Sequence, residues 1–477
     1  MNDRTVNPAP FNDRAFLAAG LGAFLFGAST FTEAPQAQGA TEPIWPTKEW
    51  QTSSPEEQGI DSRELAKLVD FGATGSLDSL LVVRHGKIVV EAYYAPYDAG
   101  IPHQMYSATK AIVSTLTAIA RKDGLLDSPD HRVLDFFDRR SIANVDDRKE
   151  AITVQNLLYM TSGIEWKQPL GGWPETMFEM ERSPNWVKFV LDRPMANAPG
   201  EIFNYSNGNA HVVSAIITRL TGISALEYAK AKLFGPLGIK DLFWQHDPQG
   251  ISYGGGGLYL QPRDMAKLGY LWLHNGRWED RQVIPGDYLA QALTRHISVQ
   301  PGIDYGYGMW LYPGHTPVDF EANGTGGQRI TVIPGLDMVE VTTGNGLDAN
   351  DVAQLIAGAA KSNEPLPPNP QADARLARLV ASVASGPVAP ANMQPREFVP
   401  VPRPKPIVVH HTLPDTLVVD RSIVPMPRLK PGAVHLSPAQ AVVEKPAPAK
   451  ATAADLAPAV PPPPATTAPA VAIAAKS

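Results

Sequence analysis

The stretch QMYSATKAIVSTLTAIARKDG, residues 104–124, indicates both a fold and a chemistry. From Ala111 onward its apolar residues recur at helical spacing, and Gly124 stands where a helix can end. The turn that opens this helix carries Ser107 and Lys110, three residues apart. This helix is mostly apolar and therefore buried, yet it begins with a serine and a lysine on one face. That combination needs a chemical explanation.

Ser107 and Lys110 are candidates for a nucleophile and its base. At the start of a helix, the free backbone N–H groups and the helix dipole favour developing negative charge. Serine attacks only when a neighbour accepts its proton. A lysine in an apolar pocket has a lowered pKa, so it can accept that proton or lower the pKa of a second base. The spacing alone also fits a lysine that reaches water beside a helix-start serine.

A second candidate element is PGEIFNYSNGNAHVV, residues 199–213, where Tyr205, Ser206 and Asn207 precede another predicted helix. A tyrosine beside a protonated lysine can act as a phenolate that takes the serine proton and returns it to the leaving group. The amide of Asn207 can hold the lysine or a substrate carbonyl. Taken alone, Tyr205 is better explained as a half-buried tyrosine whose hydroxyl is bonded.

A third candidate element is FEANGTGGQRITVIP, residues 320–334. Gly324, Gly326 and Gly327 at the edge of a strand let a ligand approach the backbone closely. One N–H group from this stretch and that of Ser107 could form an oxyanion hole. Taken alone, the stretch is better explained as a glycine-rich hairpin turn.

Strand patterns stand near both ends of the domain, with helical patterns between them. Residues 78–95 predict a hairpin around His85-Gly86. We expect an α+β fold, in which one central antiparallel sheet is assembled from both ends, helices cover both faces, and a mostly helical second lobe completes a cleft. Further strands are predicted over residues 305–312, 328–334 and 337–344, and helices over residues 153–163, 207–222, 261–276 and 351–361.

The three elements resemble, in the same order, the three signatures of the penicillin-recognising serine hydrolases. They are Ser-Ala-Thr-Lys at 107–110, Tyr-Ser-Asn at 205–207 and the glycine-rich strand near 323–327. That family includes class C β-lactamases, D-alanyl-D-alanine carboxypeptidases (a kind of penicillin-binding protein), and related esterases and amidases. The stretches MYSATK and GGQRI are most similar to the corresponding sequences of the branch that contains 6-aminohexanoate-dimer hydrolases. The resemblance covers residues 50–360 and implies a β-lactamase/transpeptidase-like fold.

The resemblance implies a role for each matching residue. Ser107 would be the acylated nucleophile, Lys110 and Tyr205 would share the general base and acid work, and Asn207 would position them. Which of Lys110 and Tyr205 is the base stays open, because the two can titrate as a coupled pair. The implied activity is hydrolysis of a small ester or amide through an acyl-enzyme. The substrate and oxyanion contacts would come from Asn207, Asn323, Gly324 and Thr325.

One departure from the family pattern concerns the third signature. Enzymes that act on penicillins usually begin it with Lys-Thr-Gly or His-x-Gly, whose cation and hydroxyl bind the substrate carboxylate. Here the region reads Glu-Ala-Asn-Gly-Thr over 321–325, with no cation before the glycine. The departure favours an uncharged ester or amide, or a linear amide with another anchor such as Arg329. The alternatives are a β-lactamase or D-alanyl-D-alanine carboxypeptidase, and a non-catalytic binding or scaffold protein.

The two ends of the chain differ from the domain, which we expect over residues 45–362. Residues 15–30 are uncharged, follow Arg14, and are shorter than the about 20 apolar residues of a spanning helix. We therefore expect residues 1–44 to be a signal peptide or membrane anchor with a linker. The expected location is exported, periplasmic or membrane-anchored, with the cytoplasm as the alternative.

The C-terminal residues 363–477 are expected to be a Pro/Ala-rich disordered tail, because 24 of the 46 prolines lie after residue 364. One short helix is predicted inside this tail, over residues 373–384. The tail is either inert or contacts the cell envelope or other proteins.

Composition excludes several classes of function. The net charge of −7 argues against a nucleic-acid partner, because phosphate binding needs a basic surface. The chain has no cysteine, so disulfides, thiolate metal sites and a cysteine nucleophile are excluded. The eleven histidines show no metal-ligand spacing. The run GGGG at 254–257 lacks the Lys-Ser or Lys-Thr of a phosphate loop, so we expect this run to be a turn that lines the cleft. No metal or cofactor is expected.

Overall fold

The computed structural model of this 477-residue chain describes residues 43–74, 77–345 and 350–386. The expected signal peptide or anchor, residues 1–44, lies outside the described residues except for its last two positions. The expected tail lies outside them beyond residue 386. Among the described helices, none alone has the length and apolar character to cross a membrane, and one bent pair, Asn207–Thr221 with Ala225–Phe234, meets both criteria together.

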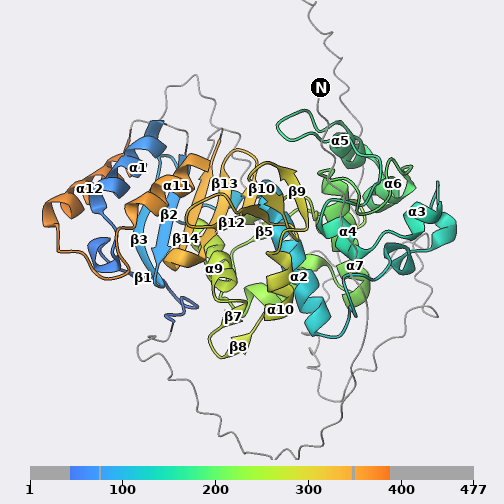
Figure 1. Cartoon of the computed structure of the whole chain (residues 1–477), viewed down its shortest axis with the longest axis horizontal. Coiled ribbons are helices and arrows are strands. Elements are labelled where there is room, and N and C mark those ends of the chain that lie inside the picture. Colours follow the sequence, from blue (N-terminus) through green and yellow to red (C-terminus); the bar gives the residue numbers. More distant parts are fainter. Residues whose placement is uncertain (1–42, 75–76, 346–349, 387–477) are drawn as a thin grey trace, which may run out of the picture. The chain divides into compact units, whose positions relative to one another are not determined.

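A nine-stranded sheet joins the two ends of the domain (Figure 1). Its order is β1-β3-β2-β14-β13-β12-β11-β10-β9, so β2 from the start of the domain pairs with β14 from its end. The expected antiparallel sheet is confirmed, with one parallel pair between β1 and β3 at its edge. The strands are β1 (Gln51–Thr52), β2 (Leu77–Arg84), β3 (Lys87–Tyr93), β9 (Ile297–Gln300), β10 (Ile303–Tyr305), β11 (Trp310–Tyr312), β12 (Asp319–Gly324), β13 (Gln328–Ile333) and β14 (Met338–Gly344).

Strands β2 and β3 form the predicted hairpin. Its turn residues, His85 and Gly86, have φ angles of 48° and 75°, both in the left-handed region. Two left-handed residues give a turn whose twist matches that of the flanking strands, and glycine adopts this φ without steric cost. The turn thereby fixes the register of β2, which is buried along its whole length.

Two helical layers cover the sheet, as expected (Figure 1). Successive side chains of a strand point to opposite faces of a sheet, so one strand can contribute to both layers. In β2, Leu81 and Val83 belong to the hydrophobic core shared with α2 and α9, whereas Leu80 and Val82 belong to the core shared with α1, α11 and α12. These covering helices are α1 (Ser62–Thr74), α2 (Thr109–Lys122), α9 (Pro262–Leu273), α11 (Asn350–Ala359) and α12 (Pro370–Ala384).

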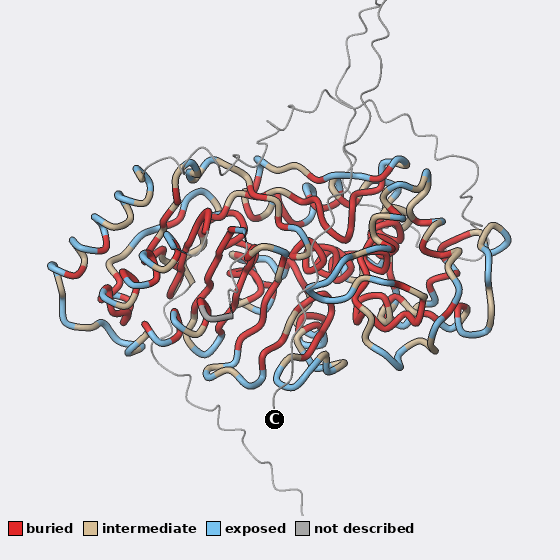
Figure 2. The backbone as a smooth tube through the Cα atoms, turned by 90° about the horizontal axis from the view of Figure 1, so that it is seen from above, coloured by how far each residue is buried: buried red, intermediate tan, exposed pale blue. Residues whose placement is uncertain are grey.

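The middle of the chain forms the expected, mostly helical lobe beside the sheet (Figure 1). Helix α2 connects the two parts, because residues 109–120 are all buried and its side chains pack with both the sheet and α7. Figure 2 shows how the buried residues gather inside the described part of the chain while the exposed ones follow its loops and outer helices. The remaining helices are α3 (Asp147–Glu150), α4 (Val154–Leu158), α5 (Glu175–Arg182), α6 (Trp186–Asp192), α7 (Asn207–Thr221), α8 (Ala225–Ala229) and α10 (Gly286–Ala292).

Within the described residues, five short strands form two further small sheets. One has the order β4-β6-β5 and the other pairs β7 with β8. The strands are β4 (His103–Gln104), β5 (Phe243–Trp244), β6 (Leu258–Leu260), β7 (Arg277–Trp278) and β8 (Arg281–Gln282).

The prediction of one strand over residues 305–312 is wrong. Strand β10 ends at Tyr305 and β11 begins at Trp310, so residues 306–309 form the turn of a hairpin between two strands. Two glycines allow this turn, and Gly308 has a φ of 70°. The alternating aromatic residues of YGYGMWLY resemble a strand, but the glycines between them bend the chain.

The predicted helix over residues 153–163 begins as expected but ends early. The Thr153 side chain accepts from the backbone N–H of Asn156, and the Asn156 side chain accepts from that of Thr153, which is a capping box. Helix α4 nevertheless stops at Leu158, and Met160 has a φ of 63°. The helix is therefore shorter than the apolar pattern suggested.

The packed structure extends past the expected domain end at residue 362. Helix α12 lies in the stretch expected to be disordered, starts before the short helix predicted there, and buries Leu376 in the core that it shares with β2 and α1. The backbone N–H of Ala95, just after β3, also donates to the carbonyl of Val383. The described part of the tail therefore belongs to the folded domain through α12.

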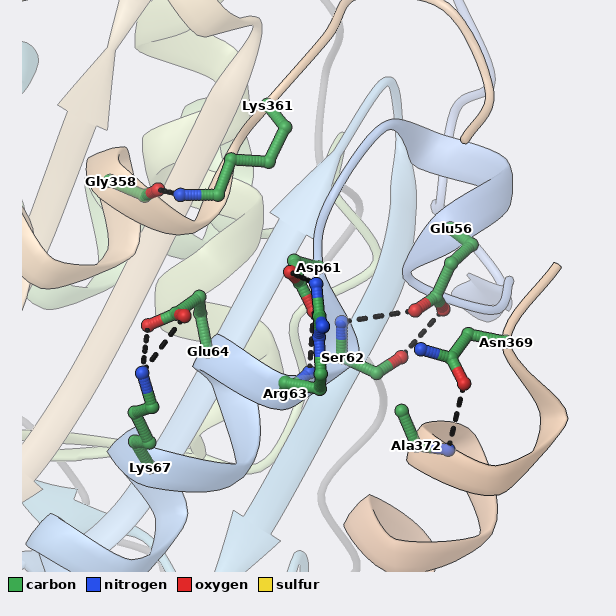
Figure 3. A network of polar contacts seen from close by, with 10 residues as sticks. All are labelled: Glu56, Asp61, Ser62, Arg63, Glu64, Lys67, Gly358, Lys361, Asn369 and Ala372. Atoms are coloured by element: carbon green, nitrogen blue, oxygen red, sulfur yellow. Dashed lines mark hydrogen bonds and ion pairs between the residues drawn. The ribbon is translucent and has the colours of Figure 1, made fainter. Parts of the chain in front are cut away.

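Polar contacts fix the starts of α1 and α12 next to each other (Figure 3). The backbone N–H and the hydroxyl of Ser62 lie 3.1 and 2.5 Å from the Glu56 carboxyl group, and the same hydroxyl lies 2.6 Å from Asp373 of α12. The Asn369 side chain accepts from the backbone N–H of Ala372 and so caps α12. These contacts tie α12 to the segment that opens the domain.

A buried carboxyl group interrupts the apolar pattern of the sheet. Glu340 on β14 pairs with Thr331 of β13 and is 1% exposed. Burial raises the pKa of Glu340 to about 7, and the nearby Glu321 carboxylate raises it further while Arg329 lowers it. The folded chain therefore favours the protonated form of Glu340.

We expect Glu340→Gln to remove a pH dependence of stability. Because the folded pKa lies above the ordinary value of 4.5, Glu340 contributes its stability in full below that value and loses it as the pH rises through about 7. The unfolding free energy of the unsubstituted chain should therefore fall relative to that of Glu340→Gln by up to about 3 kcal/mol between about pH 5 and pH 9, measured by urea unfolding. The exposed Glu364→Gln is the control, and parallel curves for the chain and Glu340→Gln would contradict the assignment.

Candidate active site

Ser107 lies on a short 3₁₀ turn, Tyr106–Ala108, that leads directly into α2. Tyr106, just before it, has a φ of 46°, an uncommon angle for a bulky residue. Backbone strain of this kind clusters at functional positions. Ser107 is half-buried, whereas residues 109–120 of the helix behind it are all buried, so the serine stands just before the buried part of α2.

Lys110 points back from the first turn of α2 to Ser107. Its Nζ lies 3.0 Å from Oγ of Ser107 and donates to Oδ1 of Asn207 at 2.6 Å and to the carbonyl oxygen of Gly255 at 2.9 Å. The side chain is 2% exposed. Burial lowers the pKa of Lys110 well below its ordinary value, because the ammonium has lost the water that would stabilise it.

Tyr205 forms the other wall of the site. Lys110 Nζ lies 4.6 Å from the centroid of the Tyr205 ring, over its face. Burial raises the pKa of Tyr205, and a hydrogen bond between its hydroxyl and Ser107 lowers it in part. Tyr205 therefore stays a neutral phenol at neutral pH, with its ring against the lysine and its hydroxyl toward the serine.

Asn207 is the first residue of α7 and reaches the lysine from the helical lobe. The helix begins here because Ser206 caps it, accepting from the backbone N–H of Asn209 at 3.1 Å. Gly255 lies against Asn207 so closely that an added Cβ would be 2.7 Å from the Cβ of Asn207. The absence of a side chain at Gly255 thus lets its carbonyl reach Lys110 beside Asn207.

The third element meets the serine through Gly324, at the end of β12. A Cβ at Gly324 would lie 2.1 Å from the carbonyl oxygen of Met105, two residues before Ser107. Asn323 is half-buried with its amide 3.4 Å from Glu321, and Thr325 is exposed and accepts a hydrogen bond from Gln328. The chain thus brings the β12 edge to the Ser107 turn, and the Asn323 side chain also bonds to Tyr312 of the neighbouring strand β11.

Two titratable side chains close to the motifs in sequence pair with carboxylates. Arg329 is buried and its Nη1 lies 3.1 Å from both carboxylate oxygens of Glu321, so it pairs with β12. His211 is fully buried and its Nε2 lies 3.1 Å from Oδ2 of Asp247. Among the described residues, no group of three or more His, Asp or Glu side chains has the arrangement of a metal site.

Sequence reasoning missed Gln168, Tyr253 and the carbonyl of Gly255. Gln168 donates to Oδ1 of Asn207 at 3.0 Å, and Tyr253 accepts from its Nδ2 at 2.7 Å. GGGG at 254–257 was expected to line the cleft, and the carbonyl oxygen of Gly255 accepts from Nζ of Lys110 at 2.9 Å. Gln168 and Tyr253 lie outside the three motifs, and the sequence signal for Tyr253 was its place directly before GGGG at 254–257.

The chain matches the family model described as Beta-lactamase over residues 77–380. It is 22% identical over 283 residues to the 6-aminohexanoate-dimer hydrolase of Paenarthrobacter ureafaciens, which covers 55% of this chain and 71% of that protein. Its structure resembles that of a Bacillus anthracis protein assigned as a 6-aminohexanoate-dimer hydrolase, with a TM-score of 0.55, 21% identity, and coverage of 66% of this chain and 87% of that one.

It also resembles EstCE1, a hydrolase with promiscuous acyltransferase activity, with a TM-score of 0.53, 16% identity, and coverage of 63% of this chain and 99% of that one. At these identities the structural likenesses show a shared fold. The family match runs from β2 to α12 and so includes all three elements of the site.

We expect Asn207→Asp to shift the acid limb of the pH–rate profile for ester hydrolysis toward higher pH. A carboxylate 2.6 Å from Nζ would stabilise the ammonium of Lys110 and raise its pKa, so the neutral amine would form only at higher pH. Initial rates against pH measure the shift. Asn144→Asp, an exposed asparagine, is the control and should leave the profile in place. An acid limb that stays in place or moves to lower pH in Asn207→Asp would contradict the role of Lys110 as proton acceptor.

Proposed function

This chain belongs to the β-lactamase family, as its sequence motifs predicted, and we propose that it is a serine hydrolase that cleaves an ester or amide through an acyl-enzyme on Ser107. The observation that carries the proposal is the set of three oxygen atoms around Nζ of Lys110. Two of them, in Asn207 and Gly255, are carbonyl oxygens, which only accept hydrogen bonds. The third is the serine hydroxyl, which can donate.

This arrangement matches a neutral lysine that acts as a base. A neutral amine has two N–H groups and one lone pair. If the two N–H groups are donated to Asn207 and Gly255, the lone pair faces Oγ of Ser107 at 3.0 Å. Burial favours this neutral form, since the pKa of Lys110 is lowered well below its ordinary value. The geometry and the protonation state thus support the same role.

The proposed reaction begins when Oγ of Ser107 attacks the substrate carbonyl carbon and its proton passes to Lys110. The tetrahedral intermediate then expels the alcohol or amine, which takes a proton from the Lys110 ammonium directly or through the Tyr205 hydroxyl. Tyr205 is suited to relay or donate a proton because burial keeps it protonated. Water attacks the resulting acyl-enzyme by the same steps in reverse order and releases the acid.

The substrate we propose is one without a carboxylate next to the scissile bond. The cation that a carboxylate would need at the third element is missing from 321–325, and Arg329 is buried in its pair with Glu321. A relative named for hydrolysis of 6-aminohexanoate dimers makes a linear amide a reasonable second substrate to test beside esters. Hydrolysis of a β-lactam is the alternative, and nitrocefin turnover would favour it.

We expect Ser107→Ala to lower kcat/KM for a nitrophenyl ester by at least about 10³-fold, because no other group can form the acyl-enzyme. Ser128→Ala, on the loop after α2, is the control and should keep the full rate. The measurement is the release of nitrophenol by the purified chain and both variants. Full activity in Ser107→Ala would show that the assignment of the nucleophile is wrong.

A further inference from the structure

We propose that Tyr253 and Glu181 are positioning residues that orient the side-chain amide of Asn207 and thereby keep Lys110 ready to accept the proton of Ser107. The proposal rests on the proposed function, because it concerns the same base. Neither residue belongs to the three motifs of the sequence. Both reach the site from the helical lobe, Glu181 from α5 and Tyr253 from the loop before Gly255.

The Asn207 amide makes four contacts, which use all of its hydrogen-bonding capacity. Its Oδ1 accepts from Lys110 at 2.6 Å and from Gln168 at 3.0 Å. Its Nδ2 lies 2.7 Å from the Tyr253 hydroxyl and 2.8 Å from the sulfur of Met177. An amide has nearly the same shape when its oxygen and nitrogen are exchanged, so only its partners decide which atom faces Lys110.

Tyr253 fixes the orientation because its own hydroxyl has a fixed direction. The hydroxyl interacts with the Glu181 carboxyl group as well as with Asn207. In its ionised form the Glu181 carboxylate only accepts hydrogen bonds, so Tyr253 then donates its single proton to Glu181 and has only an acceptor left for Asn207. The Asn207 amide must therefore turn its N–H groups to Tyr253 and its oxygen to Lys110.

Each group in this series therefore donates a hydrogen bond to the next. Lys110 donates to Asn207, Asn207 donates to Tyr253, and Tyr253 donates to Glu181. If the Asn207 amide were reversed, its N–H groups would face Lys110. The lone pair of the neutral lysine would then accept from Asn207 and would no longer be available to Ser107. This order of donors and acceptors leaves the lone pair of Lys110 facing the hydroxyl of Ser107.

Gln168 provides a second, weaker constraint on the same amide. Its Oε1 accepts from the backbone N–H of Asn207 at 3.0 Å and from the indole of Trp166 at 2.8 Å, which turns its Nε2 to Oδ1 of Asn207. Because Gln168 would keep part of the population correctly oriented, loss of Tyr253 should reduce activity without abolishing it.

The surroundings of the pair contain few other charges. Tyr253 is buried against the rings of Trp186 and His211. Burial raises the pKa of Tyr253, and the nearby Glu181 and Tyr205 raise it further. Burial raises the pKa of Glu181, while its bond with Tyr253 and the charge of Arg182 lower it. His211 is bonded to Asp247, so it does not compete for the Tyr253 hydroxyl through that nitrogen.

The test compares Tyr253→Phe, Glu181→Leu and Glu181→Gln for hydrolysis of a nitrophenyl ester. Tyr253→Phe and Glu181→Leu should each lower kcat about tenfold, the effect of one oriented hydrogen bond, with KM changed less than about twofold. Glu181→Gln keeps an acceptor for Tyr253 and should stay within about threefold of the unsubstituted chain. The double variant Tyr253→Phe/Glu181→Leu should be no slower than either single variant, since both remove the same constraint.

The pH–rate profile separates orientation from general loosening of the site. A reversed amide would place N–H groups against the Lys110 ammonium, lower its pKa, and move the acid limb to lower pH. Loosening would admit water, relieve the burial that lowers the pKa of Lys110, and move the limb to higher pH. We expect the shift to lower pH in Tyr253→Phe.

Tyr228→Phe is the matched control. Tyr228 is also buried and donates to a carboxylate, Asp123, at 3.0 Å, but it lies on α8 and has no bond to Asn207. It should keep the full kcat and an unmoved profile. If Tyr253→Phe does not fold, as judged by circular dichroism, the half-buried Glu181→Leu decides by the same criteria. Full activity or an acid limb at higher pH in the deciding variant overturns the proposal, while loss of activity in Ser107→Ala keeps the proposed function intact.

Discussion

The site depends on the burial of Lys110, whose side chain is shielded from water. A lysine normally carries a proton at neutral pH and cannot accept another. Burial at the start of α2 makes the ammonium unfavourable, and the two carbonyl oxygens of Asn207 and Gly255 satisfy the N–H groups of the neutral amine. An unpaired buried charge would destabilise the fold, so neutralisation of the lysine is also how the fold accommodates it.

The architecture explains how these atoms, far apart in the sequence, come together. Helix α2 is buried between the sheet and the helical lobe, and its first turn opens where the two meet. The lobe supplies Asn207 from the start of α7, and the sheet supplies Gly324 from the end of β12. Two glycines permit the close contacts, since a side chain at Gly255 would strike Asn207 and one at Gly324 would strike the backbone before Ser107.

Local patterns predicted the parts of the fold and of the site that depend on neighbouring residues. The β2–β3 hairpin follows from His85-Gly86, and the start of α7 and its stop at Gly222 follow from capping residues. The sequence could not reveal Gln168, Tyr253 or Glu181, because their part in the site exists only through tertiary contact with Asn207. It also placed the domain end before α12, since a proline-rich composition concealed the few apolar residues that dock it.

The central claim is that Lys110 activates Ser107, and labelling with a fluorophosphonate tests it most directly. The reagent forms a bond from phosphorus to an activated serine oxygen and releases fluoride, so intact-mass spectrometry counts the modified sites. The account predicts one adduct, on Ser107, in the purified chain, and a much slower reaction in a folded Lys110→Ala variant. No adduct on the unsubstituted chain, or equal labelling in Lys110→Ala, would contradict it.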